Sequence, residues 1–146
     1  MQKYISHSIE DTQRIASEFA KGLKTRPCVI GLIGDLGAGK TVFVRALVDA
    51  LGGNSEDVSS PTFAVLNVYD LGLGRVYHFD VYRLQNEGDV FDIGFYNAIN
   101  DKNGIVVIEW IDRLMGLEQQ VDFVVYIRHI DEMSREIEIV KNNKGG

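Results

Sequence analysis

The spacing of apolar residues changes several times along the chain, and each change marks an expected element. Near the start, Ile15, Phe19 and Leu23 recur every four residues, which places them on one face of a helix. Ser8 stands where a helix N-cap is expected, and the acidic residues after it complement the positive end of the helix dipole. The pattern therefore predicts an amphipathic helix over residues 9–23.

Two later segments are continuously apolar. PCVIGLIGD at 27–35 and GIVVIEW at 104–110 have the composition of strands buried on both faces of a sheet. A glycine-rich loop follows the first of them, and TVFVRALVDALGG at 41–53 then predicts an amphipathic helix closed by Gly52 and Gly53. This part of the chain therefore has the order strand, glycine loop, helix.

The remaining patterns predict two β-hairpins and a short helix. The segment 64–82 has two arms rich in β-forming residues around the turn LGLG, and the segment 121–140 has two such arms around DEM. GDVFDIGFYNAIN at 88–100 predicts the helix. The fold class is therefore α/β, with a mainly parallel sheet flanked by helices and antiparallel additions from the hairpins. We expect one domain over 1–140 and a polar, frayed tail over 141–146.

Composition narrows the class of protein. The chain has 146 residues, of which 45% are hydrophobic and 25% charged, as in soluble globular domains, and it shows neither a secretory signal nor a membrane-spanning run. Its single cysteine, Cys28, fits a buried thiol in a reduced, cytoplasmic protein. The net charge of -6 argues against tight, non-specific binding of nucleic acid, although the chain could still act on nucleic acid through a partner.

The glycine loop carries the most specific chemistry. GDLGAGKT, from Gly34 to Thr41, matches the P-loop pattern G-x-x-x-x-G-K-[ST], in the strand and helix context that the motif requires. Backbone amides of such a loop point at phosphate, the lysine reaches the β- and γ-phosphates, and the hydroxyl residue holds Mg²⁺. In this chain Lys40 would therefore reach the phosphates of a nucleotide, and the Thr41 hydroxyl would be a metal ligand.

Two alternatives to a P-loop fit this stretch less well. A simple glycine-rich turn would need neither the buried strand nor the amphipathic helix around it. A dinucleotide-binding fingerprint would need glycine at position 42, where the chain has Val42. The sequence therefore predicts a P-loop NTPase-like fold.

A P-loop also needs an acidic partner for its metal, and two candidates end apolar strands. Asp80 ends VYHFD and Glu109 ends GIVVIE. Either could contact Mg²⁺ directly or through water, or could position the attacking water. Asp80 could alternatively be an ordinary exposed strand residue, whereas an unpaired Glu109 on a buried strand would be costly. His78 shares a strand face with Asp80, and we interpret it as a structural histidine with satisfied hydrogen bonds rather than a catalytic one.

Four segments in order, GDLGAGKT, SSPTF at 59–63, YHFDVYRL at 77–84 and VIEW at 107–110, resemble one family. It is the small bacterial ATPase family required for threonylcarbamoyladenosine biosynthesis in tRNA (the YjeE/TsaE family). The P-loop alone is shared by many NTPases, but the last two segments are far more specific. The resemblance extends from the first predicted helix to the last hairpin.

The resemblance implies roles for individual positions. Asp80 matches the family's Walker-B-like aspartate and Glu109 its metal-associated glutamate, so that Lys40, Asp80 and Glu109 form the expected catalytic set. The resemblance also implies that the P-loop binds the ATP phosphates, through Asp35, Leu36, Gly37, Ala38, Gly39, Lys40 and Thr41. The further expected nucleotide contacts are Ser8 on the adenine side, Thr62 facing the γ-phosphate or metal, Trp110 beside Glu109, and Arg135 near the nucleotide. Arg83 could meet phosphate, a partner or a surface carboxylate. The chain departs from the family at Val42, and again at Asp112, for which no nucleotide contact is assigned.

The implied function is that of a Mg²⁺-dependent ATPase, slow alone and activated by partners. Its partners would be a TsaB–TsaD-type complex, with tRNA engaged indirectly through that complex and no membrane involved. Two alternatives stay open, a small-molecule kinase and a non-catalytic ATP-binding interaction module. A GTPase is disfavoured because the chain has no N-K-x-D motif for guanine.

Overall fold

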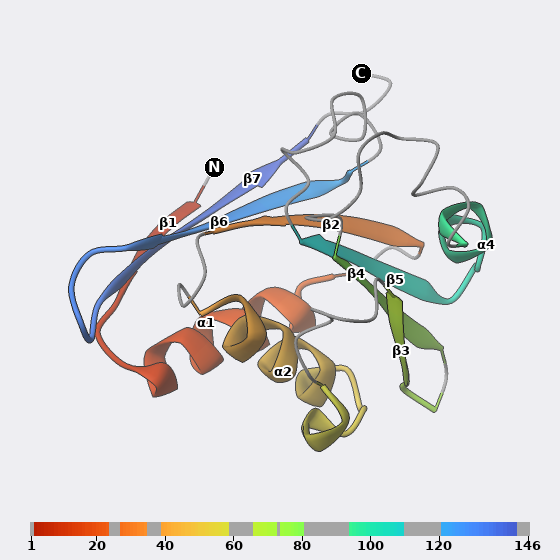
Figure 1. The fold of residues 1–146 in the computed structure, drawn as a ribbon, viewed down its shortest axis with the longest axis horizontal. Helices are drawn as coiled ribbons and strands as arrows, with labels where there is room; N and C mark the ends of the chain where they lie inside the picture. The colour runs from red at the N-terminus through yellow and green to blue at the C-terminus, as the bar shows by residue number, and fades with distance from the viewer. Residues whose placement is uncertain are drawn as a thin grey trace.

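A computed structural model describes residues 2–23, 27–34, 39–58, 66–72, 74–80, 94–109 and 121–142. These residues form one seven-stranded sheet in the order β1-β7-β6-β2-β5-β4-β3, with helices packed against it (Figure 1). The elements are β1 (Gln2–Ser6), α1 (Ile9–Lys21), β2 (Cys28–Ile33), α2 (Lys40–Ala50), η1 (Ser55–Asp57), β3 (Leu66–Asp70), β4 (Arg75–Asp80), α4 (Phe95–Ile99), β5 (Gly104–Glu109), β6 (Phe123–His129) and β7 (Arg135–Lys141).

The sheet is mixed. Its four central strands, β6, β2, β5 and β4, run parallel to one another. On the outside, β3 pairs antiparallel with β4, β7 with β6, and β1 with β7. The α/β class and the antiparallel additions are confirmed, but the description "mainly parallel" fits only the centre of the described sheet. The reason is that β1, a strand that the sequence did not predict, lengthens the edge that the second hairpin already extends.

Both predicted hairpins are present. In the first, the Leu71 amide donates to the Gly74 carbonyl over 2.9 Å, and Gly72 takes a positive φ of 85° that favours glycine. In the second, the Asp131 carboxylate accepts the backbone N–H groups of Met133 and Ser134. Local side-chain hydrogen bonds of this kind stabilise a turn between two strands.

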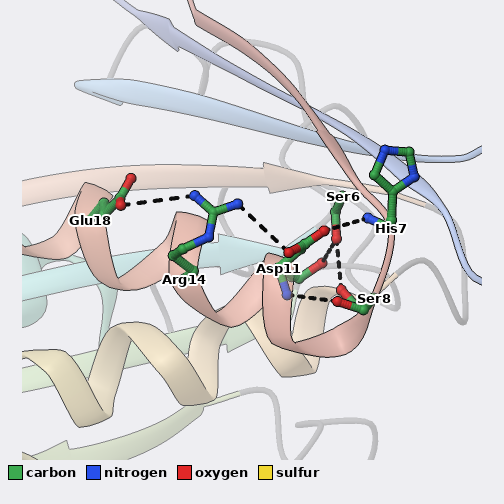
Figure 2. A network of polar contacts seen from close by, with 7 residues as sticks. Ser6, His7, Ser8, Asp11, Arg14 and Glu18 are labelled. Carbon is green, nitrogen blue, oxygen red and sulfur yellow. Dashed lines mark hydrogen bonds and ion pairs between the residues drawn. The ribbon is translucent and has the colours of Figure 1, made fainter.

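The first helix begins as its sequence indicates. Ser8 has an extended backbone, and its Oγ accepts the Asp11 amide over 3.0 Å (Figure 2). The Asp11 carboxylate in turn accepts the amide of His7, the residue before the cap, so both side chains help to hold the start of the helix. On the exposed face of the helix, the Arg14 guanidinium forms ion pairs with Asp11 and with Glu18, each about one helical turn away.

The second helix ends at the predicted glycines. Gly52 has a φ of 98°, and the Gly53 amide donates to the Val48 carbonyl over 2.9 Å, which satisfies a carbonyl of the last turn. In the predicted helix over 88–100, the described part is α4, which covers Phe95–Ile99. The earlier part of the 88–100 prediction, residues 88–93, lies outside the described residues.

The two faces of the sheet bury different clusters. Helices α1 and α2 lie side by side and cover one face (Figure 1), where their apolar side chains pack on alternate residues of the central strands. On the other face, α4 packs Phe95 and Ala98 against Phe79 and Ile108. Because β5 is buried along its whole length, any polar group at its end is held in a rigid, water-poor setting. Among the described helices, none is long and apolar enough to cross a membrane.

Candidate phosphate-binding site

Lys40 occupies the first residue of α2. Gly39, directly before it, has a φ of 109°, a conformation that side chains rarely adopt and that turns the chain into the helix. Lys40 is only 6% exposed, and its Nζ lies 3.8 Å from Oε1 of Glu109. A buried ammonium at a helix N-terminus is an unusual concentration of positive charge, and it suits an anionic ligand. Thr41 follows in the same turn and is half-buried.

Glu109 ends the central strand β5 and faces α2. Its carboxylate is almost fully buried, and its two oxygens have different partners. Oε1 faces Lys40, whereas Oε2 lies 2.5 Å from Nε2 of His78. Asp80 is paired in register with Glu109 at the end of the neighbouring parallel strand, so the two side chains share a face of the sheet. Asp80 is half-buried rather than fully exposed.

His78 is completely buried between two polar partners. Besides Glu109 on one side, its Nδ1 lies 2.9 Å from the Tyr69 hydroxyl on the other. The expectation of a histidine with satisfied hydrogen bonds is therefore confirmed. Tyr69, however, was missed by sequence reasoning. The antiparallel register of the first hairpin, which pairs Tyr69 with Val76 two residues from His78, is the signal that could have found it.

A second group of predicted residues meets at a cavity of about 240 Å³ beside the start of α2. Three of the expected nucleotide contacts, Ser8, Gly39 and Arg135, border this cavity. The remaining lining residues are Ile9, Thr12, Val42, Glu132 and Met133. The cavity thus joins the starts of both long helices to the turn between β6 and β7, with apolar walls suited to a flat ring.

Arg135 and Ser8 both have local partners at this cavity. The Arg135 guanidinium donates to the carbonyls of Asp131 and Ser134, so it braces the turn, while the Ser8 hydroxyl caps α1. In the same turn, hydrogen bonds from the backbone amide of Met133, and then from Ser134, hold the pKa of the Asp131 carboxyl below its usual range. These hydrogen bonds hold the turn, which forms one wall of the cavity.

The other predicted site residues fall outside the described part of the chain. These are Asp35, Leu36, Gly37, Ala38, Thr62 and Trp110, together with Arg83 and Asp112. The structure brings together Lys40, Glu109 and Asp80 at the carboxyl ends of parallel strands, which is where open α/β sheets bind ligands. It brings Ser8, Gly39 and Arg135 together at the adjoining cavity.

Comparison with known proteins shows the family. A family profile described as "Threonylcarbamoyl adenosine biosynthesis protein TsaE" matches residues 6–137, which is most of the chain. The chain belongs to the TsaE family. The TsaE of Aquifex aeolicus is 37% identical over 142 residues, covering 97% of this chain and 97% of that protein. The TsaE of Treponema pallidum is 38% identical over 135 residues, covering 92% and 97%.

A further TsaE protein matches this chain, and a solved structure shares its fold. The TsaE of Rickettsia conorii is 33% identical over 138 residues, covering 94% of this chain and 77% of that protein. The crystal structure of Bacillus subtilis YdiB superposes with a TM-score of 0.69 at 28% identity, covering 97% of this chain and 86% of that one. The TsaE relatives are named for the biosynthesis of threonylcarbamoyladenosine in tRNA.

Proposed function

We propose that this TsaE-family chain is a Mg²⁺-dependent ATPase that serves threonylcarbamoyl modification of adenosine in tRNA. The observation that carries the proposal is the buried Lys40 at the start of α2, with its Nζ 3.8 Å from the Glu109 carboxylate. A buried ammonium beside a buried carboxylate is costly to maintain. It becomes useful where a polyphosphate and its metal bind next to both groups.

The residues at the carboxyl ends of β4 and β5 and at the start of α2 suit a magnesium ion shared with the nucleotide. Mg²⁺ prefers oxygen ligands and is usually held by one or two carboxylates together with substrate phosphates. Thr41 and Asp80 would hold it, with Glu109 acting directly or through water. When bound, the ion would neutralise charge that develops on the phosphate oxygens.

The proposed reaction is the hydrolysis of ATP to ADP and phosphate. Lys40 would bind the β- and γ-phosphate oxygens and stabilise the charge that they share as the terminal phosphoryl group leaves. Glu109 would orient the attacking water by accepting one of its protons in a hydrogen bond. The base of ATP would enter the cavity between Ser8, Gly39 and Arg135, whose apolar walls bury a ring well.

We further propose that partner proteins complete the site. No arginine is adjacent in sequence to the loop GDLGAGKT, and an arginine supplied to the γ-phosphate commonly raises the turnover of P-loop enzymes. A TsaB–TsaD-type complex is the proposed partner, with tRNA bound by that complex. The net charge of -6 supports contact with proteins rather than direct, non-specific binding of RNA.

The experiment is Mg²⁺-dependent ATP turnover by the wild-type chain, alone and with the purified partner pair. We expect slow turnover alone, marked stimulation by the pair, and loss of both in Glu109→Gln, which keeps the side-chain shape but removes the charge. ATP binding without turnover in either condition would instead indicate an interaction module. Transfer of phosphate to a metabolite would indicate a small-molecule kinase.

A further inference from the structure

A continuous row of hydrogen-bonded side chains leads from the outer hairpin to the proposed catalytic carboxylate. It runs from Tyr69 on β3 to His78 on β4 and then to Glu109 on β5, over 2.9 Å and 2.5 Å. All three side chains are buried, on the face of the sheet that α1 and α2 cover. Beyond Glu109 the row ends at Lys40.

From this arrangement we infer that His78 and Tyr69 are positioning residues, which fix the Glu109 carboxylate for ATP hydrolysis. The inference rests on the proposed function, since it assigns the row a task in that reaction. Glu109 has one oxygen, Oε2, occupied by His78. Oε1 is therefore the oxygen that the carboxylate presents toward Lys40, beside which the phosphates of ATP would bind.

The proton that makes this contact is fixed by hydrogen-bond chemistry. An ionised carboxylate only accepts, so the Nε2 of His78 must carry hydrogen, whether the ring is neutral or charged. In the neutral ring, Nδ1 is then an acceptor, and the Tyr69 hydroxyl donates to it. Tyr69 thus selects the ring form that donates to Glu109. Outer hydrogen bonds that set tautomer and orientation in this way commonly change activity by about 10–100-fold when removed.

The burial of the row makes the orientation rigid. His78 is in register with Val107 on β5, and Glu109 is in register with Leu32 on β2, so neither backbone can shift without breaking sheet pairing. A carboxylate with one oxygen held loses the freedom to rotate about its last bond. Preorganisation of this kind favours the transition state more than it favours nucleotide binding.

The test separates binding from turnover in four variants. His78→Leu removes the donor, His78→Gln keeps an N–H at the end of the side chain, and Tyr69→Phe deletes one hydroxyl. Tyr77→Phe is the matched control, because its hydroxyl bonds Asp101, away from this row. Each variant is assayed for partner-stimulated kcat and, by calorimetry, for the Kd of Mg-ATP.

We expect His78→Leu to lower kcat by about tenfold or more while the Kd changes by less than about threefold. His78→Gln should recover part of that loss, Tyr69→Phe should lower kcat several-fold, and Tyr77→Phe should match the wild type. If His78→Leu and Tyr69→Phe both hydrolyse ATP as fast as the wild type, the inference is overturned while the proposed function stands. Absence of turnover in the wild-type chain would overturn the proposed function, and the inference with it.

A spectroscopic measurement guards against a purely structural effect. Long-range ¹H–¹⁵N NMR correlations of the three histidines, assigned through His78→Gln, report which ring nitrogen carries hydrogen. We expect a protonated Nε2 on His78, with its proton shifted far downfield, and a clear change of that signal in both Glu109→Gln and Tyr69→Phe. A His78 ring protonated only at Nδ1 would contradict the geometry on which the inference stands.

Discussion

At the scale of single residues, the most telling feature is that Glu109 divides its oxygens between a buried histidine and a buried lysine. One contact fixes its orientation, and the other keeps a positive charge at the start of α2. Sequence patterns could identify Lys40 and Glu109, because each stands in a recognisable motif. They could not identify Tyr69, since a tyrosine in a strand is ordinary until the register shows what it faces.

A different residue-scale prediction concerns the turn that borders the cavity. The folded-state pKa of Asp131 lies below its ordinary value of 3.8, mainly because its carboxylate accepts the Met133 amide. Its stabilising effect is therefore present above about pH 4 and is lost as the pH falls through the folded-state value. Urea unfolding of wild type and Asp131→Asn should give a stability difference that shrinks as the pH is lowered from about 6 to about 3. A difference that stays constant over that range would contradict the assignment.

At the scale of elements, the sequence predicted the order of the described helices, and of the described strands apart from β1. The start of α1 at Ser8 and the end of α2 at Gly52 could be predicted, because both caps act through local backbone chemistry. The strand β1 was missed because its alternation is short and its partner, β7, lies at the other end of the chain. Pairing of that kind depends on the tertiary fold and leaves no local signal.

The end of α2 offers an element-scale prediction. Gly52 has a φ of 98°, where a side chain is strained, so Gly52→Ala should reduce the free energy of unfolding by about 1–2 kcal/mol. The control is Gly22→Ala at the end of α1, where φ is -83° and an added Cβ would meet only ordinary contacts. That change should be neutral or stabilising by up to about 1 kcal/mol. Urea denaturation of both variants measures the contrast, and equal effects would refute it.

At the scale of the whole molecule, the sheet collects charged groups at one edge, beside the start of a helix. Parallel strands β4 and β5 end side by side at Asp80 and Glu109, and α2 begins next to them. The motif GDLGAGKT alone could predict a phosphate site, but not that a second hairpin would close an adjoining cavity with Arg135. That placement depends on β7 folding back beside β6.

The central claim is that this edge binds the phosphates of ATP through Lys40, and calorimetric titration of Mg-ATP tests it most directly. Removing a charged hydrogen-bond partner costs about 1.5–3 kcal/mol, so Lys40→Ala should weaken binding by about tenfold to a hundredfold. Lys102→Ala, at an exposed position in a turn, is the control and should bind like the wild type. Unfolding curves would verify that the Lys40→Ala variant, which lacks the ammonium beside Glu109, is still folded. We expect saturable binding of Mg-ATP that is weakened by the change at Lys40 and not by the change at Lys102. Equal binding by all three proteins, or no binding by the wild type, would contradict the claim.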